Sequence, residues 1–320
     1  MSGTVYKAHL IARHAESNLW LARYMERIEN LARLLDVTNT FARDAGDTRN
    51  WQSILRINGD LDAFYVKHPV ASQASVGHFY LLDADSSTSV QAAIASAREN
   101  ARTLRALIST EMWLQINVFH ARIRALTEAD LTPDHFTTVC SMLKEGTQAH
   151  TGITEGTFYR DQAWHFYMMG RYLERADQTT RLLDTRFHAL APRVAASDGE
   201  IDASQWSSLL RAAAGYHAYR REHPSGYRAQ EVTGFLLGNR SFPRSVGLNL
   251  VRIEWHLTEL RTRYHLRGTK AALERLDHLT GTLAAENLAG LVEDRLSPFL
   301  DWMQREIGEL HADIIDGFKG

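Results

Sequence analysis

The feature that most constrains the fold of this chain is a charged heptapeptide that occurs twice. Residues 23–29 read RYMERIE and residues 171–177 read RYLERAD, 148 positions apart (171 − 23). Three of the four charged positions keep their identities between the copies, and the fourth, Glu29 against Asp177, keeps its charge, whereas the apolar positions keep only their class, as Ile28 and Ala176 show. Because most surface substitutions are nearly neutral, the retained charges indicate that both segments perform the same structural or binding task.

Apolar residues recur every three to four positions along most of the chain, which is typical of amphipathic helices. One such stripe consists of Leu21, Met25, Ile28, Ala32 and Leu35. No convincing run of alternating apolar and polar residues indicates a strand. The sequence therefore predicts an all-α fold, a bundle of long helices. The expected helices are 8–44, 49–66, 86–108, 110–126, 133–146, 158–190, 203–222, 228–238, 244–266, 269–280 and 286–317.

Three irregular stretches are expected to separate the helices, at 67–85, 146–157 and 192–202. None of them resembles a long flexible linker, so 320 residues favour a single helical domain, 1–320. We expect two pseudo-equivalent halves, about 1–150 and 151–320, dividing near 146–157. Each half would carry one R-Y-x-E-R-x-[E/D] helix.

Charge and cysteine content exclude several classes of protein. The formal net charge is −2, which gives no electrostatic basis for binding nucleic acid or an anionic membrane. No apolar run approaches the length of a membrane span, and no signal-peptide core is evident, so a cytoplasmic location is expected. Cys140 is the only cysteine, which excludes internal disulfides and cysteine-rich zinc sites. We expect Cys140 to be buried and inert.

The usual catalytic motifs are missing. The sequence contains no P-loop, no dinucleotide-binding glycine motif after a strand, no His-Glu-x-x-His and no Gly-x-Ser-x-Gly. None of the 15 histidines has a glutamate three residues before it, which disfavours a di-iron carboxylate bundle. We therefore expect neither an intrinsic cofactor nor a metal, and no catalytic residue can be named. ATP, if used, would be bound by another chain or by an unrecognised pocket.

The candidate binding residues are charged or polar side chains of the repeat and of three other segments. They are Arg13, Glu16, Arg23, Glu26, Arg27, Arg98, Asn100, Arg171, Glu174, Arg175, Arg244 and Ser245. In one interpretation the arginines and glutamates of the two copies pair with each other as an internal clasp, which fixes geometry more than it adds stability. In the other they line a groove for an acidic ligand or partner.

Two of these segments have a local alternative each. The mixed cluster at 98–102 is typical of surface pairing, but it would also suit a binding site. Pro243-Arg244-Ser245 is expected to open a helix. That segment is either a plain helix start or a place where backbone N–H groups and Arg244 hold a carboxylate or phosphate.

Four stretches together resemble a known family. They are residues 13–27 (RHAESNLWLARYMER), residues 97–102 (ARENAR) with EMW at 111–113, residues 170–177 (GRYLERAD) and residues 242–246 (FPRSV). Their order and spacing cover almost the whole chain and are similar to those of the alpha-E proteins, a family named for its helices and its Glu-Arg motif.

The resemblance implies a setting for the protein. Members of the family are typically encoded beside, or fused to, a circularly permuted ATP-grasp protein. A transglutaminase-like peptidase and sometimes a proteasome-like peptidase are encoded nearby. ATP-grasp enzymes join a carboxylate to an amine through an acyl phosphate, so the resemblance implies a helical partner subunit of a peptide- or amide-forming ligase. ATP and Mg²⁺ would then bind to the partner chain.

Three functional hypotheses remain open from the sequence. The chain is a partner subunit that offers an Arg/Glu-lined groove, or a stand-alone amide-bond transferase or ligase, or a structural adaptor with an internal salt-bridge clasp. An enzyme using Glu26 or Glu174 as a base is disfavoured, because carboxylates paired with arginine have lowered pKa values. The substrate and the oligomeric state are not encoded in any motif.

Overall fold

The computed structural model describes residues 10–45, 49–194, 199–288, 291 and 295–319. Within these ranges the regular elements are helices and no strand is present, which confirms the all-α prediction. The elements are α1 (Ala12–Ala45), α2 (Arg49–Asn58), α3 (Leu61–Lys67), α4 (Gln73–Leu81), α5 (Val90–Thr103), α6 (Thr110–Arg124), η1 (Glu128–Leu131), α7 (Phe136–Thr157), α8 (Gln162–Val194), α9 (Gly199–Ala212), α10 (Tyr216–Glu222), α11 (Ala229–Gly238), α12 (Val246–Arg263), α13 (Lys270–Ala285) and α15 (Leu296–Lys319).

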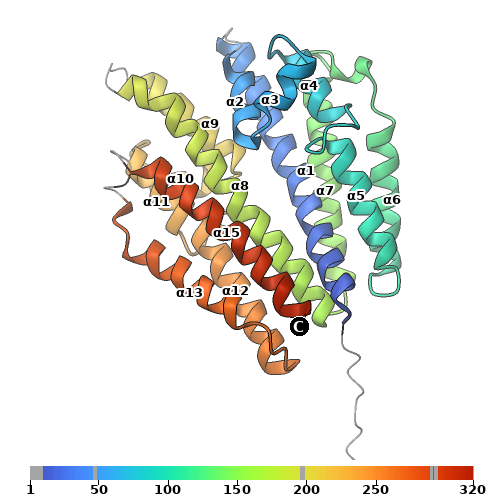
Figure 1. Cartoon of the computed structure of the whole chain (residues 1–320). Coiled ribbons are helices and arrows are strands. Elements are labelled where there is room, and N and C mark those ends of the chain that lie inside the picture. The colour runs from blue at the N-terminus through green and yellow to red at the C-terminus, as the bar shows by residue number, and fades with distance from the viewer. Residues whose placement is uncertain (1–9, 46–48, 195–198, 289–290, 292–294, 320) are drawn as a thin grey trace, which may run out of the picture.

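Helices α1 and α8, which carry the two copies of the repeat, lie side by side at the centre of the molecule (Figure 1). Among the described elements, no other pair of helices is in more extensive contact. Helices α5 and α7 pack on α1, and α12 and α15 pack on α8. The buried apolar residues form two clusters, and both central helices contribute to both. The predicted equivalence of the two halves stays a prediction.

The two central helices approach each other closely at Gly170. A Cβ atom placed on Gly170 would lie 2.1 Å from the carbonyl oxygen of Leu19, which is far inside van der Waals contact. Only glycine allows two backbones to come this close. Gly170 immediately precedes the second heptapeptide, so the close approach sets how the two charged segments face each other.

Four helices begin at a serine whose hydroxyl oxygen accepts a backbone N–H of the first turn, the usual N-cap arrangement. These serines are Ser72, Ser89, Ser109 and Ser245. At Ser72 the cap is reciprocal, because Ser75 accepts the backbone N–H of Ser72 in return. This capping box starts α4 inside residues 67–85, where an irregular stretch was predicted, so that prediction is wrong for α4.

Other predicted boundaries are also wrong. Residues 146–157 were expected to be irregular, but α7 continues through them to Thr157. The predicted helix 49–66 is interrupted at Gly59, whose φ of 74° favours glycine. The predicted helix 203–222 is interrupted between α9 and α10. Of the predicted loop 192–202, residues 195–198 lie outside the described residues, and the flanking residues are helical. None of the described helices is long and apolar enough to cross a membrane.

Candidate functional site

The two glutamates of the repeat are paired with arginines of the opposite copy. Arg27 Nε lies 2.5 Å from Glu174 Oε1, and Arg175 Nε lies 2.9 Å from Glu26 Oε1. Arg23 Nε adds a second contact with Glu174, at 2.7 Å from Oε2. The side chain of Glu174 is fully buried and that of Glu26 is 4% exposed. The cross-pairing is therefore an internal arrangement between α1 and α8.

Arg244, from the segment before α12, completes the arrangement on the side of Glu26. Its Nη1 lies 2.9 Å from Glu26 Oε1, and its Nη2 lies 2.9 Å from Glu29 Oε1. Arg244 also donates to Asn30 Oδ1, and its own carbonyl accepts a hydrogen bond from Thr179 Oγ1 at 2.7 Å. Each glutamate thus contacts two guanidinium groups, which compensates for its burial. We call Arg23, Glu26, Arg27, Glu174, Arg175 and Arg244 the ER clasp.

Each of the two central helices contains one further ion pair next to the ER clasp. Arg33 Nη2 lies 2.6 Å from Glu29 Oε1, and Arg181 Nε lies 2.8 Å from Asp177 Oδ2. Both pairs span four residues of one helix, and they occupy matching positions in the two copies. Apart from Arg171, which pairs with Glu155, the charged side chains of the two heptapeptides therefore pair with each other or with Arg33, Arg181 and Arg244.

The electrostatic environment keeps both central glutamates ionised. Burial alone would raise the pKa of Glu26, but Arg175 and Arg244 lower it to about 2. For Glu174 the burial effect is also outweighed, by Arg23 and Arg27, and its pKa is lowered. A carboxylate with such a low pKa is a weak general base at neutral pH. Glu26 and Glu174 therefore act as fixed negative charges that position the arginines around them.

One edge of the ER clasp opens to solvent at a small hollow of about 180 Å³. Arg27 lines this hollow, and its side chain is 36% exposed, the most of any clasp member. Two short polar side chains from the segment before α5, Ser87 and Thr88, also line the hollow. The hollow therefore gives solvent and small solutes access to one arginine of the clasp.

The remaining predicted site residues lie apart from the ER clasp or serve other contacts. Arg13 and Glu16 are exposed on the first turns of α1. On α5, Arg98 donates to Asn117 Oδ1 at 2.7 Å, and Asn100 is half-buried. None of these four residues forms an ion pair with a described residue of the clasp. The structure therefore does not gather all candidates into one site.

Two residues near the clasp bind within the chain itself. Ser245 caps α12 and is fully buried, which matches the plain helix start rather than an anion site. Arg171 is also buried, and its Nη1 lies 3.2 Å from Glu155 Oε1. The candidates predicted from the sequence did not include Glu29 and Asn30. Glu29 aligns with Asp177 in the repeat, and this retained charge is the signal that would have found it.

A family model for an alpha-helical domain with a conserved ER motif, Alpha-E, matches residues 10–318. The chain belongs to the Alpha-E family. The Glu-Arg pairs of this chain, Glu26-Arg27 and Glu174-Arg175, are the residues that cross-pair in the ER clasp. No curated protein and no solved structure matches the chain.

The Alpha-E chain also buries polar groups away from the clasp. Cys140 is buried, as expected, and burial raises the pKa of its thiol, which keeps it unreactive. Among the described residues, no group of three or more histidine, cysteine or carboxylate side chains is placed to hold a metal ion.

His165 and His256 form a buried pair, with their Nδ1 atoms 2.9 Å apart. One ring must donate to the other, so the accepting ring is neutral, and burial, which lowers the pKa of both rings, favours the neutral form of the donor as well.

The buried histidines make the stability of the Alpha-E chain sensitive to acid. Burial lowers the pKa of His165 to about 4, and those of His256 and His150 to about 3. The unfolded chain protonates these rings near pH 6.5, whereas the folded chain does so only near pH 3–4. Stability is therefore unaffected above about pH 7 and falls as the pH drops from about 6.5 toward 4. The loss is about 1.4 kcal/mol per pH unit for each histidine that titrates in this way.

Urea unfolding at a series of pH values measures this slope. His165→Gln removes one titrating ring and is expected to flatten the slope between about pH 6 and 4. Ala271→Gln, a change at an exposed position on α13 that involves no titrating group, should leave the slope as it is. Equal slopes in the wild-type chain and in His165→Gln would contradict the assignment.

Proposed function

We propose that this Alpha-E chain is a non-catalytic helical partner subunit of an ATP-grasp-type carboxylate–amine ligase system. The family resemblance supports the ligase context. In this proposal the ER clasp holds α1 and α8 in register, and the hollow at its edge is the Arg-lined groove offered to the ligand or to the partner. ATP and Mg²⁺ bind to the partner chain.

The observation that carries the proposal is the state of the repeated carboxylates. Glu26 and Glu174 are buried, ionised and each held by two arginines. They are poor bases, which argues against a stand-alone amide-bond transferase. Arg27, in contrast, is held by Glu174 through Nε, so its terminal nitrogens keep donor capacity toward the hollow. A guanidinium held in place in this way suits a carboxylate or phosphate oxygen.

The proposal is tested by co-expressing the chain with its ATP-grasp protein and measuring complex formation and ligase turnover. We expect a complex, and turnover that depends on this chain. Ser87 is exposed at the rim of the hollow, so Ser87→Trp fills the hollow without removing an ion pair. We expect this variant to lose ligase stimulation by about tenfold or more while keeping its thermal stability. Ala271→Trp, at an exposed position on α13, is the matched control.

Two results would count against the proposal. If no complex forms and turnover is the same without this chain, the ligase partnership is wrong. If the complex forms but Ser87→Trp stimulates as well as Ala271→Trp, the hollow is not the groove. Transglutaminase-like and proteasome-like peptidases belong to the proposed system as further candidates for partners, to be tested by the same co-expression.

A second candidate function is a purely structural adaptor, and the cross-pairing itself favours it. Arg27–Glu174 and Arg175–Glu26 are internal contacts between buried or half-buried side chains, which is what a clasp requires. In that case the hollow has no ligand, and the chain contributes only a rigid helical surface. The two candidates predict different results for Ser87→Trp. This variant loses ligase stimulation if the hollow binds a ligand or the partner, and keeps it if the chain is only an adaptor.

A further inference from the structure

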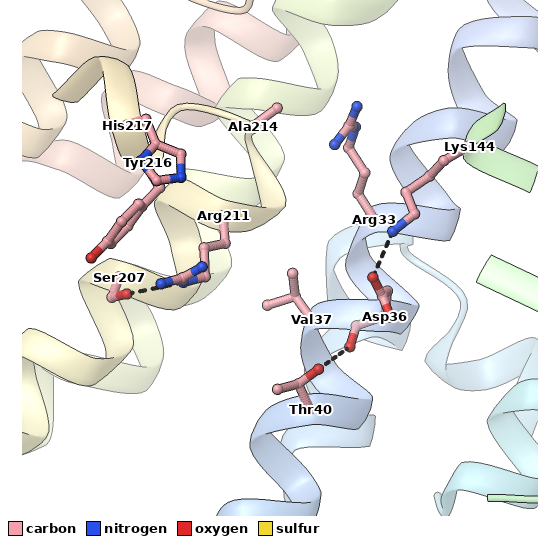
Figure 2. Close-up of a pocket in the computed structure, with 10 residues that line it drawn as sticks. All are labelled: Arg33, Asp36, Val37, Thr40, Lys144, Ser207, Arg211, Ala214, Tyr216 and His217. Carbon is pink, nitrogen blue, oxygen red and sulfur yellow. Dashed lines mark hydrogen bonds and ion pairs between the residues drawn. The ribbon is translucent and has the colours of Figure 1, made fainter. Parts of the chain in front are cut away.

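A larger cleft, of about 600 Å³, lies on another part of the molecule (Figure 2). Figure 2 shows Arg33, Asp36 and Val37 of α1 on one side, and Arg211 and Tyr216 of the α9–α10 corner on the other. Lys144 of α7 reaches the same cleft from beside α1. The volume is in the range of small-molecule sites in proteins.

The charges that line this cleft are unbalanced. Among the described lining residues, three are cationic (Arg33, Lys144 and Arg211) and one, Asp36, is a carboxylate. Lys144 Nζ lies 2.7 Å from Asp36 Oδ2, so these two neutralise each other. Arg33 contacts Glu29, outside the cleft lining, through Nε and Nη2. Its Nη1 therefore keeps donor capacity.

Arg211 supplies the second available guanidinium. It contacts two neutral groups, the hydroxyl of Ser207 at 3.4 Å and the ring of Tyr216, whose centroid lies 4.0 Å from the guanidinium carbon. Stacking on an aromatic ring positions a guanidinium without using its N–H groups. Arg211 also lies in the last turn of α9, where the helix dipole favours a cation.

The turn after Arg211 explains how the tyrosine reaches it. The N–H of Gly215 donates to the carbonyl of Leu210 at 2.7 Å, and the N–H of Ala214 donates to that of Arg211 at 3.0 Å. This pattern ends a helix with one left-handed residue, and Ala214 occupies that position with a φ of 57°. The left-handed region is unfavourable for alanine. This unfavourable backbone conformation lies in the turn that brings the ring of Tyr216 against Arg211.

We propose that this cleft binds a small organic anion, whose carboxylate or phosphate group sits between Arg33 and Arg211. The apolar part of the ligand would lie against Val37 and the ring of Tyr216. Both arginines line one cavity although they come from elements far apart in the sequence, and guanidinium groups form strong, often bidentate contacts with carboxylate and phosphate oxygens. The site is separate from the hollow at the ER clasp, and the proposal does not rest on the ligase partnership.

Calorimetric titration of the full chain tests the site, with citrate as the carboxylate probe and pyrophosphate as the phosphate probe. The ionic strength is held constant, because screening weakens exposed charge contacts. We expect at least one probe to bind, and the stronger one identifies the class of ligand. Arg211→Ala should weaken binding about tenfold or more, and Arg211→Lys should weaken it less, because lysine keeps the charge but loses the planar fork.

The control variant is Lys270→Ala, which removes an equally charged but highly exposed side chain outside the cleft. It should leave the affinity unchanged. Arg211 is exposed, so its variants are expected to fold, and thermal unfolding checks this. The proposal is overturned if neither probe binds at about 10 mM, or if Arg211→Ala and Lys270→Ala have the same affinity.

Discussion

Glu174→Gln is expected to lower the free energy of unfolding by about 3 kcal/mol. Glutamine has nearly the same shape as glutamate, so the change removes charge and leaves the packing intact. Arg23 and Arg27 would then lose the carboxylate that each contacts, at 2.7 and 2.5 Å. A buried partner that loses its counter-charge costs more than the net contribution of the intact pair. Arg27 is partly exposed, and hydration offsets some of this cost.

Chemical denaturation with urea, with far-ultraviolet circular dichroism as the signal, measures the change. Glu26→Gln is the reciprocal variant and should lose a similar amount, since it leaves Arg175 and Arg244 without their shared carboxylate. The control is Glu99→Gln, which breaks an exposed ion pair with Arg102 on α5. Exposed pairs contribute little, so that variant should unfold like the wild-type chain. If Glu174→Gln were as stable as Glu99→Gln, the ER clasp would not hold the helices together.

The two copies of the repeat carry enough information to predict much of the ER clasp from the sequence. Charges are retained where apolar identities drift, and the Glu-Arg pairs of the two copies contact each other in the fold. The sequence leaves two interpretations open, because a helical surface with alternating arginines and glutamates suits both a clasp and a groove. Burial and distance separate them: Glu174 is fully buried and lies 2.5 Å from Arg27.

Residues that the repeat does not include are harder to predict. Arg244 was a candidate for holding an external carboxylate, but it contacts Glu26 and Glu29 of its own chain. No periodicity relates Arg244 to α1, so only the folded arrangement shows this. The same holds for the cleft that Arg33 and Arg211 line, because the two arginines come from helices that meet only in the tertiary structure.

The predicted break at residues 146–157 is wrong because glycines occur inside helices as well as at their ends. Residues 146–157 were expected to be irregular because they contain three glycines, yet α7 continues through them. At Gly146 a Cβ atom would lie 2.2 Å from the ring of Phe119. Gly146 therefore makes room for a neighbouring side chain and does not end the helix, whereas a Cβ atom on Gly152 or Gly156 would have nothing within 4 Å. A sequence pattern alone does not distinguish these two uses.

The same use of glycine leads to the second large effect. Gly170→Ala is expected to destabilise the chain by about 3 kcal/mol, at the upper end of the usual cost of overpacking. The added methyl group would lie 2.1 Å from the carbonyl oxygen of Leu19. A backbone atom of a central helix has no rotamer with which to move aside, so α1 and α8 would have to separate. Separation would also lengthen the contacts of the ER clasp, whose first member on α8, Glu174, lies four residues after Gly170.

Gly308→Ala is the matched control, because Gly308 lies inside α15 and a Cβ atom there would have nothing within 4 Å. Alanine is the better helix former, so this variant should gain about 0.5–1 kcal/mol. Thermal and urea unfolding measure the stability of both variants. The same change from glycine to alanine is expected to destabilise the chain at position 170 and to stabilise it at position 308. If Gly170→Ala were also stabilising, the central helices would not be held at the close distance that the clasp geometry requires. A combined Gly170→Ala and Glu174→Gln variant should lose less than the sum of the two, since both changes weaken the same contact between α1 and α8.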